Sequence, residues 1–337
     1  MRHNVLMTTL TIGKLRGLKQ IASPEGIFTM CALDHRGSFR RMINPQEPAS
    51  VTYQEIVTRK LELCSALGPH ASALLIDPIF GAAQSINQDV LPRGTGLLVS
   101  TEATGYEGGT EHRVTALLEE WGVEKIRRMG ASAAKMLVYY RPDLWPLALE
   151  QLKTVSTVAT ECLKHDLPFL VEPVSYPVGK ETGDPEAFAR QKERIVIQTA
   201  RDITSLPIDV LKAEFPADLR YRQDTDELVD LCRQLNEASR VPWVILSAGV
   251  DFDTFARQVE IACRGGASGF LGGRAIWQEA MDITEREERV RFLSTVAAER
   301  TRRLADIAHT YGTPWYRRYG DSPVGLAEVS ETWHQQY

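Results

Sequence analysis

Short apolar segments alternate with longer amphipathic segments along most of the chain. Eight apolar runs are each followed by a polar loop, and most of these loops lead into a stretch with helical periodicity. This alternation is typical of repeated βα units and a parallel sheet. The predicted strands are Phe28 to Leu33, Ala73 to Ile76, Gly96 to Ser100, Ala133 to Tyr139, Phe169 to Glu172, Val210 to Phe215, Trp243 to Ser247 and Ser268 to Leu271.

Eight strands alternating with helices favour a closed (β/α)8 TIM barrel, an α/β fold, over an open sheet. No GxGxxG motif follows the first strand, so a dinucleotide-binding fold is disfavoured. We expect one domain over 1–337, with an N-terminal helical extension at 1–26 over the barrel floor and a C-terminal extension at about 300–337. Helices are predicted at 53–67, 115–130, 146–165, 184–203, 224–239 and 253–266.

The composition narrows the class of protein. With 43% hydrophobic and 25% charged residues, the chain can form a large core, which excludes disordered and fibrous proteins. The net charge of -5, without a basic run interleaved with aromatics, disfavours nucleic acid as a partner. No apolar run approaches the roughly 18 residues of a membrane span, and no signal peptide is recognisable. The five cysteines are scattered and lack CxxC pairs, so we expect reduced thiols in a soluble, cytoplasmic protein.

Ionisable residues occupy positions where strands should face the barrel interior. Side chains alternate across a strand, so Lys212 shares one face with Val210, while Leu211 and Phe215 lie on the face that packs under helices. A buried ammonium is unfavourable unless it is paired or its pKa falls. The alternative interpretation is a lysine at a strand end that reaches solvent or pairs with Glu214.

Three further inward positions favour chemistry over this alternative. Lys135, Glu172 and Asp34 also point inward, near the C-terminal ends of their strands, where barrel active sites are built. A structural network of two salt bridges would satisfy the same groups. Two lysines in one pocket should lower the pKa of one of them from about 10.4 toward neutrality, giving a nucleophilic amine. Such an amine attacks ketones and aldehydes, and nearby carboxylates transfer the protons.

The ends of the last two strands suggest a phosphate site. Ser247 and Gly249 follow strand seven, and Gly272, Gly273 and Arg274 follow strand eight. Glycines let backbone N–H groups approach an anion, a following helix N-terminus adds its dipole, and arginine offers a charged, forked contact. Each feature alone also fits a tight turn or a surface arginine.

Metal chemistry has little support in the histidines. Of seven histidines, His35 and His112 fall near the predicted rim, whereas a zinc enzyme needs several clustered ligands. We therefore expect neither metal nor organic cofactor. His35, beside Asp34, is a candidate polar site residue or, alternatively, a loop histidine that faces water.

With these residues identified, the chain resembles the class I tagatose 1,6-bisphosphate aldolase family, which includes the sulfofructosephosphate aldolases. The resemblance runs from about residue 10 to about 320. Its carriers are AlaLeuAspHisArgGly at 32–37, AlaLysMetLeuValTyrTyr at 134–140, LeuValGluPro at 170–173, LeuLysAlaGluPhePro at 211–216, LeuSerAlaGlyVal at 246–250, and ArgGlyGlyAlaSerGlyPheLeuGlyGlyArgAlaIleTrp at 264–277.

The resemblance implies roles for these residues. Lys212 would form the Schiff base, Glu172 would be the principal acid/base, and Lys135 and Asp34 would orient substrate and tune charge. Ser247, Gly273 and Arg274 would bind the phosphate on carbon 1, and Arg36 is a candidate for the distal anion. The family usually has Gln at the position of His35, which puts the stereochemical preference in question.

The implied reaction is cleavage of a ketohexose 1,6-bisphosphate, with tagatose 1,6-bisphosphate as the expected substrate. The products would be dihydroxyacetone phosphate and glyceraldehyde 3-phosphate. The alternatives are a sulfonate in place of the distal phosphate, or a sugar-phosphate sensor without catalysis. The sequence also leaves open whether the protein forms a homo-oligomer.

Overall fold

A closed barrel of eight parallel strands forms the centre of the molecule. The structure is a computed structural model and describes residues 10–337. Each strand pairs with its neighbours in chain order, and β1 pairs with β8 to close the barrel. The TIM-barrel prediction is therefore confirmed. The strands are β1 (Phe28–Leu33), β2 (Ala73–Ile76), β3 (Gly96–Ser100), β4 (Ala133–Tyr139), β5 (Phe169–Val174), β6 (Val210–Ala213), β7 (Trp243–Leu246) and β8 (Gly269–Gly272).

The strand positions agree with the hydrophobic pattern, and only some ends differ. The first four strands match the predicted ranges, whereas β5 continues to Val174 and β6 ends at Ala213 rather than Phe215. β7 ends at Leu246 instead of Ser247, and β8 is shifted by one residue from the range predicted for it. The residue at which a strand ends depends on the neighbouring strands with which it pairs, and an apolar run in the sequence does not specify this pairing.

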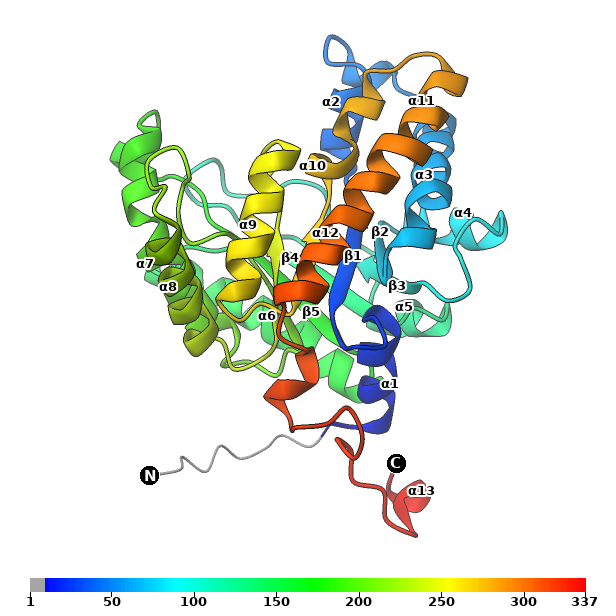
Figure 1. The fold of residues 1–337 in the computed structure, drawn as a ribbon, viewed down its shortest axis with the longest axis vertical. Helices are drawn as coiled ribbons and strands as arrows, with labels where there is room; N and C mark the ends of the chain where they lie inside the picture. Colours follow the sequence, from blue (N-terminus) through cyan, green and yellow to red (C-terminus); the bar gives the residue numbers. More distant parts are fainter. Residues whose placement is uncertain (1–9) are drawn as a thin grey trace.

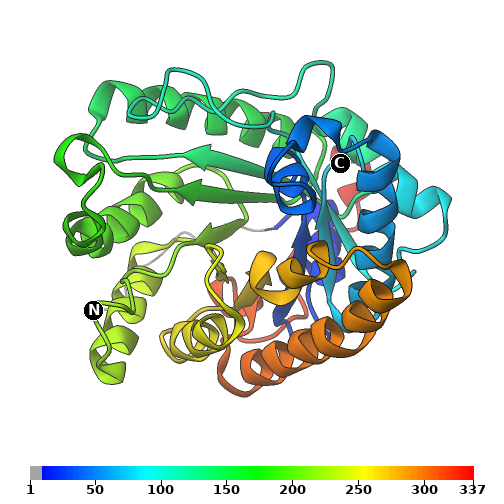
Figure 2. The same ribbon diagram turned by 90° about the horizontal axis from the view of Figure 1, so that it is seen from above.

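Helices surround the barrel, as the view from above shows (Figure 2). The α-helices are α1 (Ile12–Ile21), α2 (Gly37–Ile43), α3 (Tyr53–Leu67), α4 (Ala82–Asn87), α5 (Val123–Arg128), α6 (Trp145–Lys164), α7 (Pro185–Ile203), α8 (Thr225–Ala238), α9 (Phe252–Arg264), α10 (Arg274–Trp277), α11 (Arg286–Phe292), α12 (Ala298–Tyr311) and α13 (Trp333–Gln336). Short 3-10 turns lie at Pro48–Ser50, Gly68–His70, Gly179–Glu181, Gln278–Met281 and Trp315–Arg318, and a π-helical turn at Leu293–Ala297 joins α11 to α12.

One predicted helix is largely wrong. The helix expected at 115–130 is reduced to α5, because the first part of this range is extended and lies antiparallel to the segment that follows β3. Glu102 bridges Leu117 and Glu107 bridges Val114. We call residues 102–117 the β3–α5 hairpin. Its extended backbone outweighs the helical periodicity of the local sequence, as tertiary context often does.

The barrel has two apolar layers. Residues such as Ala133, Leu170 and Val210 fill the lower interior of the barrel, whereas Leu211 and Phe215 belong to the larger layer between strands and helices. The alternation of side chains along a strand separates the two layers. The residues two positions after the interior ones therefore also face the interior, but nearer the C-terminal end of the strands.

The segments at the two chain ends have different roles. α1 covers the floor of the barrel, opposite α2 and α10 (Figure 1). The part of the expected N-terminal extension before residue 10 lies outside the described residues. Residues 300–311, expected in the C-terminal extension, instead belong to α12, which packs against α9, β1 and β8. Within the described chain, no helix is long and apolar enough to span a membrane.

Candidate active site

The C-terminal ends of the strands enclose a cavity of about 470 Å³. All of the predicted catalytic residues line it, together with His35, Arg36, Ser247, Gly273 and Arg274. The interior alternation explains this placement, because Lys135, Glu172 and Lys212 each stand two residues beyond the apolar residues that fill the barrel below. The exposed His112, on the β3–α5 hairpin, does not line the cavity.

Lys135 is the centre of the charge network. Its ammonium lies 2.8 Å from Asp34, 2.7 Å from Glu102 and 3.0 Å from Glu172, and the side chain is 1% exposed. Burial acts to lower the pKa of Lys135, but the charges of these three carboxylates raise it well above its ordinary value. If the pKa of one of the two lysines is lowered, as the sequence led us to expect, that lysine is not Lys135. This residue stays a cation and orients the carboxylates around it.

Glu172 joins the two lysines. One carboxylate oxygen lies 2.8 Å from Lys212 and the other 3.0 Å from Lys135. Burial acts to raise the pKa of Glu172, but the two ammonium groups outweigh this effect, and the pKa lies below its ordinary value. Among residues 10–337, Glu172 is the only carboxylate that pairs with Lys212. The arrangement places one proton acceptor directly beside one amine.

Asp34 is ionised for a similar reason. Burial opposes its charge, but the ammonium groups of Lys135 and Lys212 lower the pKa of Asp34 well below its ordinary value. Its carboxylate lies 2.8 Å from Lys135, and its second oxygen lies 3.9 Å from Nδ1 of His35. Asp34 thus extends the charged network toward the loop after β1.

His35 is an uncharged imidazole at the cavity wall. Burial lowers the pKa of His35 to about 3, although the neighbouring charge of Asp34 acts to raise it. The ring packs edge-on against Trp277, with 5.3 Å between the ring centroids. Its buried Nδ1 has no hydrogen-bond partner within the described residues. The ring therefore offers polar atoms to a ligand without adding a charge.

The turn after β7 is shaped around Arg274. Ala248 and Gly249 both have positive φ, at 47° and 78°. A Cβ at Gly249 would lie 3.0 Å from the guanidinium carbon of Arg274, so glycine meets both the backbone and the space requirement there. The hydroxyl of Ser247 accepts a hydrogen bond from the backbone N–H of Gly273 at 3.4 Å. Ser247, Ala248, Gly273 and Arg274 line one corner of the cavity, whereas Gly249, beside the guanidinium of Arg274, does not line it.

Two features of the predicted phosphate site differ from expectation. Gly272 lies in β8, and a Cβ there would contact Phe255 and Ile276, on the helix side rather than the cavity side. α10 has four residues, so the helix dipole that we expected to support an anion is weak. Anion binding at this corner would depend mainly on Arg274 and on backbone N–H groups.

Three arginines line the cavity without an ion-pair partner in residues 10–337: Arg36, Arg41 and Arg274. Arg36 is buried, and one of its terminal nitrogens donates to the Glu102 carbonyl at 2.6 Å. Its other terminal nitrogen, Nη1, has no hydrogen-bond partner within the described chain. Unpaired guanidinium groups in a cavity favour an anionic ligand.

Sequence reasoning missed Glu102. This residue is 5% exposed, lies just after β3 and pairs with Lys135, and its Oε2 has no hydrogen-bond partner within the described part of the chain. The register Ser100↔Lys135 at the end of β3 places the following segment beside Lys135, but this register cannot be read from one strand alone.

Glu214, weighed as a partner for Lys212, instead lies 3.6 Å from Lys192 of α7 and lines the cavity.

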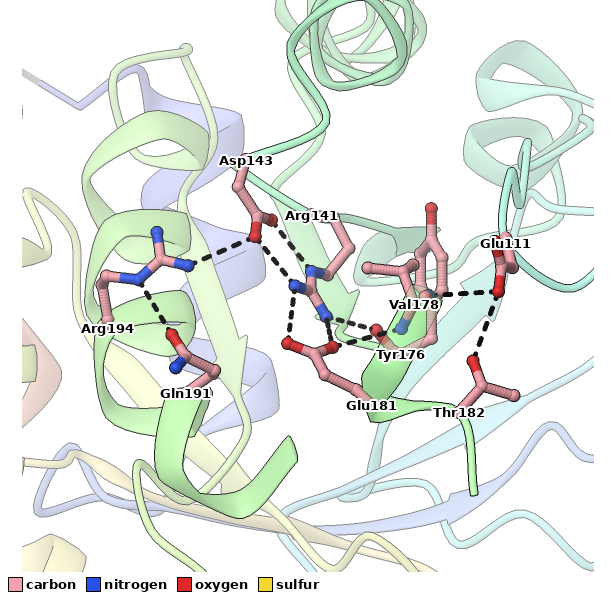
Figure 3. Close-up of polar contacts among 10 residues, drawn as sticks. Glu111, Arg141, Asp143, Tyr176, Val178, Glu181, Thr182, Gln191 and Arg194 are labelled. Carbon is pink, nitrogen blue, oxygen red and sulfur yellow. Dashed lines mark hydrogen bonds and ion pairs between the residues drawn. The ribbon is translucent and has the colours of Figure 1, made fainter. Parts of the chain in front are cut away.

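A buried arginine joins the loops that follow β4 and β5 (Figure 3). Arg141, after β4, pairs with Asp143 and Glu181 and donates to the Tyr176 carbonyl at 2.7 Å. Glu111 of the β3–α5 hairpin accepts hydrogen bonds from the same loop after β5. These contacts join the loops after β3, β4 and β5 to one another, although none of the residues that make them lines the cavity.

The low pKa of His35 predicts a pH-dependent contribution to stability. The folded imidazole is neutral, whereas the unfolded one gains a proton below about pH 6.5. Acidification from pH 7 to pH 5 therefore favours the unfolded state, by up to about 1.4 kcal/mol per pH unit below the unfolded pKa. We expect His35→Asn to lose less stability than wild type over this interval. Urea unfolding at both pH values measures the difference, and equal losses would contradict a neutral His35.

Comparison with known proteins identifies the family. Residues 28–279 match the model of the DeoC/LacD family aldolases. The chain is 31% identical to tagatose 1,6-diphosphate aldolase 1 of Enterococcus faecalis over 288 residues, 82% of this chain and 87% of that protein. It is 28% identical to a tagatose 1,6-diphosphate aldolase of Listeria monocytogenes over 332 residues, 93% of this chain and 97% of that protein.

Solved structures support the fold. A fructose-bisphosphate aldolase from Plasmodium falciparum aligns with a TM-score of 0.70 at 14% identity, over 90% of this chain and 97% of that one. A Schiff-base-forming fructose-1,6-bisphosphate aldolase aligns with a TM-score of 0.58 at 20% identity, over 88% of this chain and 99% of that one. The sequence matches confirm the resemblance recognised from the motifs: the chain belongs to the DeoC/LacD family of aldolases.

Proposed function

We propose that the protein is a class I aldolase that cleaves a ketohexose 1,6-bisphosphate through a Schiff base on Lys212. The observation that carries this proposal is the position of Glu172, whose carboxylate lies 2.8 Å from the Lys212 amine and 3.0 Å from Lys135. Tagatose 1,6-bisphosphate is the proposed substrate, because the relatives described above carry that name.

The proposed reaction depends on the contact between the Lys212 amine and the Glu172 carboxylate. Lys212 transfers a proton to Glu172 and attacks carbon 2 of the ketose to form a carbinolamine. Glu172 returns this proton to the carbinolamine hydroxyl, which leaves as water and gives an iminium. Glu172 then removes the proton from the hydroxyl on carbon 4, and the bond between carbons 3 and 4 breaks. The bonding electrons move into the iminium, which becomes an enamine, and glyceraldehyde 3-phosphate leaves. Protonation at carbon 3 and hydrolysis release dihydroxyacetone phosphate and the free amine.

The charges of the cavity support a substrate with two anionic ends. Arg274, with Ser247, Ala248 and Gly273, would bind the phosphate on carbon 1. Arg36, on the side of the β3–α5 hairpin, would bind the distal anion. Between them, Lys135 and Asp34 would orient the hydroxyl groups. Lys135 keeps its proton in this scheme, because its pKa is raised.

The first prediction concerns the position of the covalent adduct. Dihydroxyacetone phosphate with borohydride should leave a reduced adduct on Lys212 and abolish activity, because reduction makes the carbon–nitrogen bond permanent. Peptide mass spectrometry locates the adduct. Lys135→Met should still be labelled, whereas Lys212→Met should not. An adduct on Lys135 would reverse the proposed roles of the two lysines.

The second prediction tests the acid/base. Glu172→Gln should lower kcat by roughly two to four orders of magnitude, the usual cost of losing a general acid/base, with a smaller change in KM. Steady-state kinetics with tagatose 1,6-bisphosphate and its stereoisomers measure the loss, and including a 6-sulfonate analogue identifies the distal anion. If kcat stays within a few-fold of wild type, another carboxylate such as Asp34 transfers the proton.

The third prediction separates phosphate binding from damage to the fold. Arg274→Ala should weaken dihydroxyacetone phosphate binding by about 1.5 to 3 kcal/mol, roughly one to two powers of ten in Kd. Unphosphorylated dihydroxyacetone serves as the control ligand, and its binding should change little because it has no anion for Arg274 to contact. Equal weakening of both ligands would make Arg274 structural, and no weakening of either would place the phosphate elsewhere.

A further inference from the structure

A second buried lysine–aspartate pair lies behind the cavity rather than in its wall. Lys60 of α3 and Asp77, just after β2, are 2.5 Å apart, and their side chains are 1% and 0% exposed. Neither residue lines the cavity. The proposed reaction therefore gives this pair no direct chemical role.

The pair makes directed contacts with the backbone at the strand ends. The Lys60 ammonium also donates to the carbonyl of Leu33, the last residue of β1. The other oxygen of Asp77 accepts hydrogen bonds from the backbone N–H groups of Ile79, at 2.9 Å, and Phe80, at 2.8 Å. Lys60 thus joins the end of β1 to the turn after β2.

The Leu33 carbonyl belongs to the peptide that leads into Asp34. The preceding peptide is held as well, because the indole N–H of Trp277 donates to the Ala32 carbonyl at 3.1 Å. Two side chains from the helix layer thus donate hydrogen bonds to the carbonyls of the two peptides before Asp34. The direction of the Asp34 carboxylate, 2.8 Å from Lys135, depends on these peptides.

Stability alone gives little reason for a charged pair at this place. Removing two charges from water has a large cost, and buried ion pairs replaced by apolar residues often leave stability unchanged or increased. An apolar side chain at position 60 would fill the space but could not donate to the Leu33 carbonyl. The distinctive contribution of Lys60 is therefore geometric.

We propose that Lys60, held by Asp77, is a positioning residue that directs Asp34 toward Lys135 in the aldolase site. This inference rests on the proposed function for its kinetic consequence, but its structural consequence can be tested separately. Since the effect acts through Asp34, it should appear in the chemical step more than in substrate binding.

The test uses the double variant Lys60→Met/Asp77→Asn, which removes both charges while the amide side chain at position 77 keeps an acceptor for the turn. We expect kcat to fall about 10- to 100-fold, the cost of a displacement of about 1 Å in a catalytic group, while KM changes less than about threefold. Borohydride trapping on Lys212 should persist. In a crystal structure of the variant, the distance from Asp34 to Lys135 should exceed the roughly 3.5 Å limit of a hydrogen bond.

A matched control is available at the other end of the barrel. Lys14 and Asp209 form another buried pair, 2.8 Å apart, under the barrel floor. Lys14→Met/Asp209→Asn should leave kcat unchanged, because no part of this pair contacts the cavity. If the test variant does not fold, Trp277→Phe removes the second donor conservatively and should give the same separation of kcat from KM.

The outcomes distinguish the positioning role from the proposed function. Unchanged kcat and an unchanged distance of 2.8 Å between Asp34 and Lys135 in the test variant would overturn the positioning role. Equal losses of kcat in the test and control variants would overturn it too, since they would indicate general destabilisation. If wild type cleaves none of the ketose bisphosphates but the distance lengthens in the variant, the proposed function fails and the positioning role is supported.

Discussion

The ammonium group of Lys135 inside the barrel is the constraint on which the arrangement of the site depends. Three carboxylates share this one cation, at 2.7 to 3.0 Å. Without its charge, like-charge repulsion and burial would favour protonation of at least one carboxylate. With it, Glu172 and Asp34 remain ionised, and Glu172 can accept a proton from Lys212. Lys135 therefore determines the protonation states through which the proposed reaction runs.

The positions of these charges follow from the geometry of parallel strands. Ala133, Leu170 and Val210 fill the barrel below, and the next inward positions on the same strands carry Lys135, Glu172 and Lys212. The apolar residues close the floor against water, so the charged residues above them can reach solvent only through the cavity. A one-residue shift in any of these strands would place its charged side chain under the helices instead. The register of the strands therefore determines which side chains form the site.

The same alternation explains how much the sequence predicted. It placed the eight strands and the inward direction of Lys212, Lys135 and Glu172, because these depend on local patterns with a period of two. It did not find Glu102, which lies beyond β3 in an irregular segment and reaches Lys135 only through pairing between strands. The helix expected at 115–130 failed for a similar reason, since long-range bridges keep its first part extended. The raised pKa of Lys135 was also missed, because it depends on how many carboxylates surround one amine.

The lysines in the cavity are paired with carboxylates, whereas the arginines are not, and this difference affects how an anionic substrate would bind. The lysines at the centre are matched by carboxylates, so transfer of a proton between Lys212 and Glu172 leaves the net charge of the centre unchanged. Arg36 and Arg274, in contrast, have no ion-pair partner in residues 10–337, and Gly249 leaves space for the guanidinium of Arg274. Arginine keeps its charge at every working pH, so the affinity for anionic ends should be insensitive to the proton transfers at the centre. The neutral His35 adds no charge between these regions. Substrate binding and proton transfer can therefore be carried out by separate charges in the same cavity.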